Sequence, residues 1–278
     1  ISMLGRKSGD SLVLGSRERR IIVGNHEIPI RTWSESLVQR YEPDLVMDFA
    51  FLTRDLEVTL GAKKFRAINN VLSTRLLGLS RMVTVRKVLT ISSGAAIVSK
   101  LGPDSSTLDI YGQQKLATES SLKELAGQGG TEVAVARAWS VSGGHVQKHG
   151  NYAFSEMIHS ALKLGTISIK ANNLVFRRYC SVEDFLAVVM FNCRGNAWVD
   201  IDSGGPLVEL GELAQAVAGE VEGCELPAGI EARGSGVADN YHSDNSTWVA
   251  ACQSAGLEPL TLVEQIRNVR DSLRNFEL

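Results

Sequence analysis

The sequence predicts an α/β protein with a mostly parallel β-sheet, and three observations carry this prediction. Short apolar runs alternate with longer amphipathic stretches along the chain, which is typical of βα units. The apolar runs are rich in Val, Leu and Ile at successive positions, as expected of strands buried on both faces. The chain has 278 residues, 44% of them hydrophobic, so it can bury a large core.

The elements can be assigned in chain order. Five apolar runs predict strands at residues 11–16, 44–50, 86–93, 131–139 and 197–203. Apolar residues at spacings of three and four predict amphipathic helices at 63–82 and 111–125. After residue 141 the pattern changes, and helices are predicted at 152–164, 183–192, 209–221, 246–255 and 260–274. We therefore expect a main domain at 1–141, to which 179–203 returns, and a smaller lobe at 142–178 and 204–278.

Composition narrows the function. The formal net charge of −2 shows no basic excess, which argues against a nucleic-acid partner and favours a small molecule. The four cysteines, at positions 180, 193, 224 and 252, form no CxxC pair, so we expect reduced thiols in a cytoplasmic protein, with no disulfide and no metal. No apolar stretch of about 18 residues predicts a membrane span. The chain starts abruptly, without an initiator methionine or a signal sequence.

Tyr111 and Lys115, in the sequence YGQQK, are the first candidate catalytic pair. A spacing of four places both side chains on one helix face, and a nearby ammonium lowers the pKa of a phenol. Ser105, Ser106 or Thr107 is expected to cap this helix. The strand at 86–93 ends in Ser92-Ser93, at the sheet edge where open α/β sheets bind ligands.

A YxxxK pair alone is weak evidence, because Tyr and Lys also meet by chance on exposed helix faces. The order of segments is more specific: a strand ending in two serines, then a YxxxK helix, then another apolar strand.

This order resembles the extended short-chain dehydrogenase/reductase family, the NAD-dependent epimerase/dehydratase group, over essentially residues 11–274. Matching segments are PDLVMDFAFLTRD at 43–55, with Asp48 where His is common, AINNVLSTRLL at 67–77, VLTISSGAAI at 88–97, ARAWSVSGG at 136–144 and FRRYCSVEDF at 176–185. The resemblance implies a Rossmann-like doubly wound parallel sheet that binds a dinucleotide, with a smaller, mostly C-terminal substrate lobe.

The resemblance also implies residue roles. Tyr111 would be the acid/base, Lys115 would hold the cofactor ribose, and Ser93, favoured by register over Ser92, would bond the reacting oxygen. The implied cofactor-binding residues are Ser16, Arg17, Ala50, Phe51, Asn69, Ser92, Tyr111 and Lys115. The implied substrate-binding residues are Ser93, Ser140, Arg177, which would meet a substrate diphosphate, and Tyr241. In relatives, helices matching 63–82 and 111–125 pair in a homodimer.

The sequence departs from the family pattern at its start. The family begins with a strand and a GxxGxxG loop for the cofactor pyrophosphate, and this element is absent here. Residue 1 is expected to lie in the helix after that loop, so that the sheet would lack its first central strand. We therefore expect an N-terminal truncation, an unordered start or an interruption in the sequence.

Two short segments discriminate between activities. Arg17 follows Ser16 at the end of the strand at 11–16, which corresponds to the second strand of the family. An arginine at this position suits a 2′-phosphate, so NADP is favoured and NAD is possible. Gly94-Ala95 stands where 4,6-dehydratases carry an Asp-Glu pair. We therefore expect a nucleotide-sugar ketoreductase or 4-epimerase. The alternatives are a reductase of a non-sugar carbonyl and a non-catalytic nucleotide-sensing relative.

Overall fold

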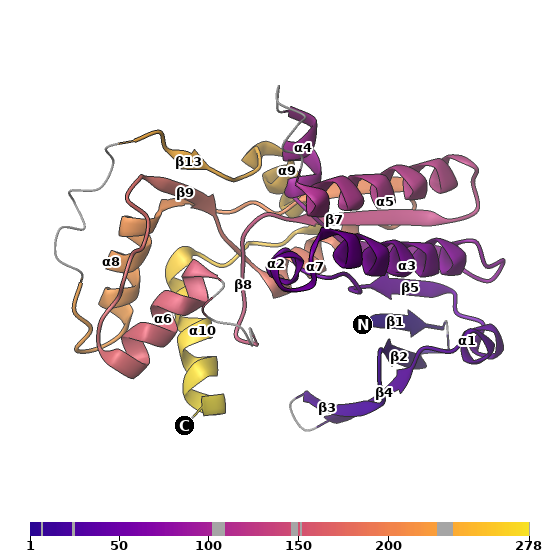
Figure 1. Ribbon diagram of the computed structural model, residues 1–278, viewed down its shortest axis with the longest axis horizontal. Coiled ribbons are helices and arrows are strands. Elements are labelled where there is room, and N and C mark those ends of the chain that lie inside the picture. The colour runs from indigo at the N-terminus through magenta and orange to yellow at the C-terminus, as the bar shows by residue number, and fades with distance from the viewer. Residues whose placement is uncertain are drawn as a thin grey trace. The chain divides into compact units, whose positions relative to one another are not determined.

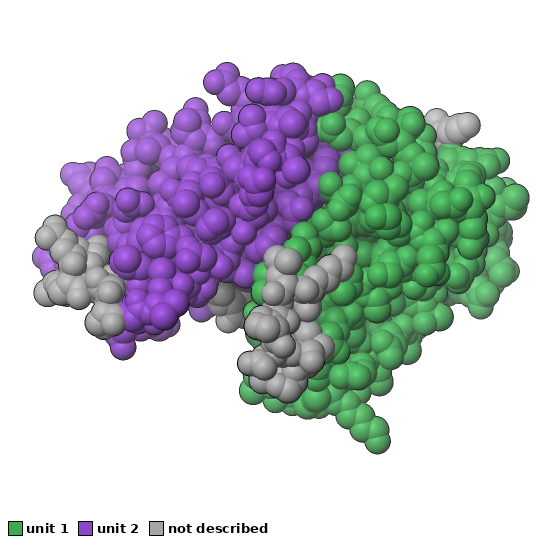
Figure 2. Space-filling view, turned by 90° about the horizontal axis from the view of Figure 1, so that it is seen from above, with its two compact units in different colours: residues 1–137, 190–200 green, residues 138–189, 201–278 purple. Residues whose placement is uncertain are grey.

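The computed structural model describes residues 1–6, 8–23, 26–101, 109–145, 150, 152–226 and 236–277. The chain divides into two compact units, coloured green and purple in Figure 2. Unit 1 comprises Ile1–Arg137 and Met190–Asp200, and unit 2 comprises Ala138–Val189 and Ile201–Leu278. Three segments that were expected to belong to the main domain group with unit 2, namely residues 138–141, 179–189 and 201–203.

An eight-stranded, mostly parallel sheet forms the centre of unit 1, in the order β11-β7-β6-β5-β1-β2-β4-β3 (Figure 1). Its strands are β1 (Ser2–Gly5), β2 (Ser11–Gly15), β3 (Arg19–Val23), β4 (His26–Thr32), β5 (Leu45–Asp48), β6 (Lys87–Ser93), β7 (Glu132–Ala138) and β11 (Trp198–Asp202). A strand occurs at each of the five predicted positions. The predicted Rossmann-like α/β fold is confirmed.

The parallel register of β5 and β6 positions the candidate site. Leu45 pairs with Lys87 and Asp48 with Thr90, so both strands end at the same edge of the sheet. The interior of β6 is buried on both faces, as its unbroken apolar run predicted. Polar side chains that follow the apolar positions, such as Ser92 and Ser93, are therefore held together at this edge.

The prediction that the chain starts within a helix is wrong. Ser2–Gly5 forms β1, which pairs antiparallel with both β2 and β5 and so occupies the position between them. Leu4 is fully buried in the core formed with Leu14 and Val46, and this burial favours a strand over a solvated helix end. The gap that the missing first strand was expected to leave is thus filled, in the opposite direction.

The helices of unit 1 are α1 (Glu35–Tyr41), α2 (Asp55–Leu60), α3 (Ala62–Ser80), α4 (Ala95–Leu101) and α5 (Ile110–Gly127). Helices α3 and α5 lie side by side (Figure 1), joined by a hydrogen bond of 2.8 Å between the hydroxyls of Ser73 and Thr118. Leu76 and Leu122 bury the apolar faces of these helices in the sheet core.

The N-cap of α5 is Asp109, whose carboxylate accepts a hydrogen bond of 3.1 Å from the Tyr111 amide. The cap predicted at Ser105, Ser106 or Thr107 falls outside the described residues. Asp109 lies directly before the helix, so its short side chain reaches the unpaired amides of the first turn. The cap places Tyr111 in that first turn.

Unit 2 packs helices around two small sheets, β12-β9-β13 and β10-β8. Its elements are β8 (Val141–Ser142), α6 (Ala153–Leu164), β9 (Val175–Arg178), β10 (Cys180–Ser181), α7 (Val182–Asn192), β12 (Leu207–Glu209), α8 (Leu210–Glu220), β13 (Asp239–Asn240), α9 (Asn245–Ala255) and α10 (Leu262–Glu277). The core includes Ile158 of α6, Leu213 of α8 and Ile266 of α10. Among the described residues, no helix is long and apolar enough to cross a membrane.

Candidate active site

Tyr111 and Lys115 lie on one face of α5, and Phe51, from the loop after β5, packs against both. The rings of Phe51 and Tyr111 meet edge to face, with centroids 5.7 Å apart and an interplanar angle of 80°. The Lys115 ammonium lies 3.9 Å from the centroid of the Phe51 ring and 5.9 Å from that of Tyr111. A phenol and a cation are thereby held close together beside an aromatic wall.

Lys115 is the most strongly perturbed cation of this face. Its side chain is buried and its Nζ donates a hydrogen bond of 2.7 Å to the carbonyl oxygen of Ile91. Burial lowers the pKa of Lys115 to about 8, against the opposing charges of Asp48 and Glu119. The ammonium form thus predominates at neutral pH, within about one pKa unit of its titration.

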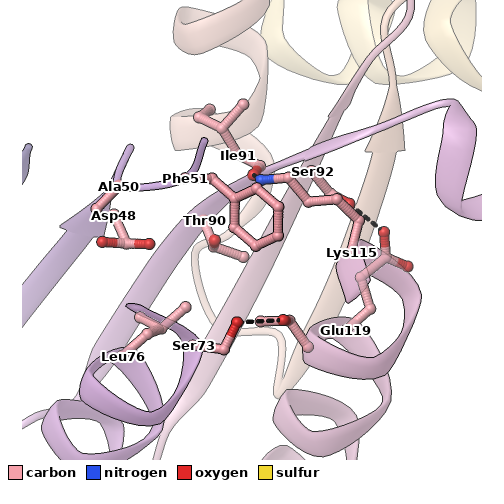
Figure 3. Close-up of a pocket in the computed structure, with 11 residues that line it drawn as sticks. Asp48, Ala50, Phe51, Ser73, Leu76, Thr90, Ile91, Ser92, Lys115 and Glu119 are labelled. Carbon is pink, nitrogen blue, oxygen red and sulfur yellow. Dashed lines mark hydrogen bonds between the residues drawn. The ribbon is translucent and has the colours of Figure 1, made fainter. Parts of the chain in front are cut away.

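Asp48 ends β5 and faces the same region. Its carboxylate accepts a hydrogen bond of 2.6 Å from the Ser2 hydroxyl, and burial raises its pKa while that bond and Lys115 oppose the rise. Figure 3 shows Asp48, Lys115 and Glu119 around a cavity of about 10 Å³, the size of a single water. Asp48, placed where the family commonly has His, therefore supplies a buried carboxylate to the site.

The two serines at the end of β6 point in different directions, because neighbouring strand residues face opposite sides of a sheet. Ser92 donates its hydroxyl hydrogen to Glu119 (Figure 3). The Ser93 hydroxyl oxygen accepts a hydrogen bond of 3.2 Å from the Ala95 amide at the start of α4. Ser92, expected at the cofactor, is thus engaged by a carboxylate of α5.

Glu119 belongs to a buried ion network that the sequence reasoning missed. Arg137 of β7 donates to it from Nε at 3.1 Å and from Nη2 at 2.9 Å. Arg137 also pairs with Asp200 of β11 at 2.7 Å. A signal was present, because Glu119 follows Lys115 by four residues and Arg137 interrupts a buried strand, where an arginine needs a partner.

A cavity of about 480 Å³ adjoins this face of unit 1 at the ends of β2 and β5. Four of the predicted cofactor residues, Ser16, Arg17, Ala50 and Phe51, line it. Trp33 and Arg75, which were not predicted from the sequence, also line it, and the Arg75 guanidinium carbon lies 5.3 Å from the Trp33 ring centroid. The volume is within the range of about 300–1,000 Å³ found for small-molecule sites.

Asn69 supports the cavity wall. It is fully buried on α3, and its side-chain oxygen accepts a hydrogen bond of 2.8 Å from the Leu52 amide. Its amide nitrogen faces Gln114 at 3.4 Å. These contacts hold the Ala50–Phe51 loop against α3, so the side chain of Asn69 is already used by the protein.

Several groups that line the cavity are of types that could hold a nucleotide. Arg17, Arg19 and Arg75 supply cations suited to phosphate, and Trp33 offers an aromatic face. Gly15 allows the side chain of Ile30 to pack closely against the end of β2, since a Cβ at position 15 would lie 2.8 Å from Ile30 Cγ2. In the family, a glycine-rich turn before a helix binds the cofactor pyrophosphate. Residues 2–5 of this chain form β1 instead, and so they do not provide that binding turn.

In unit 2 the structure brings together two predicted substrate residues, Arg177 and Tyr241. The Arg177 guanidinium carbon lies 5.6 Å from the Tyr241 ring centroid, and its Nη2 pairs with Asp239 at 2.7 Å. The Tyr241 ring also packs on Trp139, with centroids 4.9 Å apart. Ser140, the third predicted residue, follows Trp139 and is half-buried.

Comparisons with known proteins agree with this architecture. The family described as "NAD dependent epimerase/dehydratase family" matches residues 11–196. No curated protein sequence gives a significant match.

Solved structures share the fold at low sequence identity. UDP-glucose 4-epimerase from Thermotoga maritima, with UDP-glucose, is 19% identical, with a TM-score of 0.68, covering 92% of this chain and 88% of that one. MoeE5, with UDP-glucuronic acid and NAD, is 20% identical, with a TM-score of 0.68 and coverages of 95% and 90%. RMD from Pseudomonas aeruginosa, with NADPH, is 22% identical, with a TM-score of 0.59 and coverages of 83% and 81%.

The family match spans well over half of the chain and includes Tyr111, Lys115 and both serines of β6. The family predicted from the motifs is confirmed: this chain belongs to the NAD-dependent epimerase/dehydratase family.

Proposed function

We propose that this protein is an NAD(P)-dependent ketoreductase or 4-epimerase of a nucleotide sugar, with Tyr111 as its acid/base. The observation that carries the proposal is the packing of Tyr111 and Lys115 around Phe51, next to the serine-bearing end of β6 and the 480 Å³ cavity. Proteins of similar fold that were solved with UDP-glucose, UDP-glucuronic acid, NAD or NADPH suggest the ligand classes.

The chain's own groups divide the work. The Tyr111 phenol exchanges a proton with the sugar hydroxyl or ketone, and the Lys115 ammonium stabilises the phenolate form. Ser93, at the end of β6, donates a hydrogen bond to the reacting oxygen. When bound, a nicotinamide ring supplies or accepts the hydride.

The residues after Ser93 argue against dehydration. Elimination of water needs an acid and a base beside the reacting carbons, and Gly94-Ala95 carries no carboxylate. Ala95 is 2% exposed, so the start of α4 is packed against the protein at this position. Proton exchange at a single carbinol oxygen needs only Tyr111 and Lys115 from this chain, and a bound nicotinamide would carry the hydride.

The arginines of the cavity favour NADP over NAD. Arg17 lines it from the turn after β2, Arg19 from the start of β3, and Arg75 from α3. Arg17→Ser is expected to weaken NADPH binding about tenfold and to leave NADH binding nearly unchanged, since only NADPH carries the 2′-phosphate. The control Arg20→Ser removes an exposed arginine that pairs with Glu27. Equal losses for both nucleotides in Arg17→Ser would contradict the preference.

Arg177 and Tyr241 are proposed to bind the nucleotide diphosphate, with Ser140 nearby in the chain. Arg177 already pairs with Asp239, so a diphosphate would compete with this carboxylate for the guanidinium. This contact supports the alternative, a substrate without a diphosphate such as a non-sugar ketone. Arg177→Ala separates the two possibilities. It raises the KM for a nucleotide sugar but leaves the KM for a non-sugar ketone unchanged.

Tyr111→Phe tests the catalytic role directly. It removes the phenolic hydroxyl and keeps the ring that packs on Phe51, so turnover is lost while nicotinamide nucleotide affinity stays within about twofold. Tyr152→Phe, a change at an exposed tyrosine of unit 2, is the matched control. Binding and nicotinamide absorbance are followed with NADPH, NADH and UDP-, GDP-, CDP- and dTDP-sugars. Unchanged turnover in Tyr111→Phe would remove this residue from the mechanism.

The proposal includes a homodimer through α3 and α5. These helices lie side by side and present a shallow cavity of about 470 Å³ to the surface, lined by polar side chains that include Arg66, Asn70 and Gln113. Sedimentation equilibrium of wild type and of Asn70→Arg measures the association. A monomeric wild type would contradict the dimer.

A further inference from the structure

The buried carboxylate of Glu119 lies on the same helix stripe as the candidate catalytic pair. Tyr111, Lys115 and Glu119 are each four residues apart, so one face of α5 carries all three. Glu119 is 5% exposed, and a carboxylate this buried needs compensating partners. Its partners come from two other elements, Ser92 at the end of β6 and Arg137 on β7.

The contacts of Glu119 reach the site in two ways. Its hydrogen bond with Ser92 fixes the strand end next to Ser93, and that strand end also carries the Ile91 carbonyl that accepts from Lys115. Its negative charge acts directly on Lys115. Arg137 donates hydrogen bonds to the Glu119 carboxylate from Nε and Nη2 and so holds it in one position. The hydrogen bond to Ser92 and the charge near Lys115 therefore both come from a fixed carboxylate.

We propose that Glu119 is a positioning residue of the active site, which fixes the end of β6 through Ser92 and keeps the Lys115 ammonium in place through its charge. Its role in catalysis rests on the proposed function, but its effect on Lys115 and β6 does not need a bound ligand.

The electrostatics of Lys115 support this role. The charged and titratable groups around Lys115 are Asp48 of β5 and Tyr111 and Glu119 of α5, while Arg54 lies 5.8 Å from the Tyr111 ring centroid. Burial lowers the pKa of Lys115 to about 8, and Asp48 and then Glu119 raise it. Loss of the Glu119 charge therefore shifts Lys115 towards the neutral amine near pH 8.

Two variants separate the charge from the hydrogen bond. Glu119→Gln removes the charge and keeps a carbonyl oxygen that can accept from Ser92. Ser92→Ala removes the hydrogen bond and keeps the charge. Glu124→Gln, the same change at an exposed position of α5, is the matched control.

The readouts use the full chain without ligand. Carbon NMR of lysine labelled at Cε follows the titration of Lys115, whose signal is assigned from its absence in Lys115→Met. In Glu119→Gln the ratio of ammonium to amine at pH 8 falls by about threefold or more, as half a pKa unit implies. Ser92→Ala shifts this titration less than Glu119→Gln does, since the charge is kept, and speeds amide hydrogen exchange at residues 91–93. Glu124→Gln changes neither.

An unchanged Lys115 titration in folded Glu119→Gln overturns the proposal, as does unchanged exchange of the β6 end in Ser92→Ala. If Glu119→Gln does not fold, the double change with Arg137→Met removes the buried guanidinium as well, and a smaller fall in the ratio is expected, because a positive charge is lost together with the negative one. In wild type, a lack of nicotinamide nucleotide binding would refute the proposed function alone. Where activity is present, Glu119→Gln and Ser92→Ala lower kcat by a larger factor than they raise KM. A purely structural role would not affect kcat in preference to KM.

Discussion

Replacement of Lys115 with methionine is expected to stabilise unit 1, at the expense of the candidate site. The pKa of Lys115 is about 8 in the folded protein, against an ordinary value of 10.5, because burial disfavours the ammonium. Each pKa unit corresponds to about 1.4 kcal/mol, so the buried ammonium costs about 3 kcal/mol at pH 7. Methionine fills a similar volume without a charge but leaves the Ile91 carbonyl without its donor. Lys115→Met should therefore raise the free energy of unfolding at pH 7 by up to about this amount.

The pH dependence makes the prediction specific. A lysine whose folded pKa is depressed destabilises the protein fully below about pH 8, and this penalty disappears as the pH rises to about 10.5, where the unfolded chain also loses the proton. The stability difference between Lys115→Met and wild type should thus be constant up to about pH 8 and shrink towards zero above it. The contributions to stability of groups that titrate equally in both proteins cancel in this difference.

Urea unfolding at a series of pH values, followed by circular dichroism, measures the difference. Hydrogen exchange in α5 and β6 shows whether the change lies in unit 1. Lys64→Met, at an exposed position of α3, is the control and should change stability by less than about 0.5 kcal/mol. If Lys115→Met is no more stable than wild type at pH 7, or if the difference does not depend on pH, the account of a destabilised buried ammonium is refuted.

Three further changes and one control test the packing, each by urea unfolding. Arg137→Met leaves the buried Glu119 carboxylate without its guanidinium and should cost about 3–5 kcal/mol, whereas Arg20→Met, at an exposed ion pair, should cost about 1 kcal/mol or less. Asn69→Ala leaves the Leu52 amide without its acceptor and should cost about 1–3 kcal/mol, with faster exchange of that amide. Gly205→Ala places a Cβ 2.0 Å from the Tyr179 carbonyl oxygen at a φ of 110° and should cost about 3 kcal/mol or more. Equal effects of the two arginine changes, or a neutral Gly205→Ala, would contradict the packing described.

The local elements could be predicted because their patterns are short-range. Unbroken apolar runs fixed the strands at 86–93 and 131–139, and the three- and four-residue spacings fixed the helices at 63–82 and 111–125. The spacing of Tyr111 and Lys115 alone placed them on one face of a helix, since the helical period is a property of the backbone.

The start of the chain shows where local pattern was insufficient. Ser2–Gly5 has too few residues to carry a period, and its sequence neighbours suggested the end of a helix. The strand arises from contacts distant in sequence, with β5 on one side and β2 on the other, which bury Leu4. The secondary structure of such a short segment depends on the strands with which it pairs, and the segment's own sequence does not reveal them.

The sequence by itself therefore determined the fold class, the family and the pair Tyr111 and Lys115, because each depends on local periods or on the order of segments. The tertiary structure decided what surrounds the pair: Asp48 from β5, Ser92 from β6 and the Glu119–Arg137 ion pair. These groups meet through the register of separate strands against α5, and their burial, which sets the pKa of Lys115, exists only once those strands have packed.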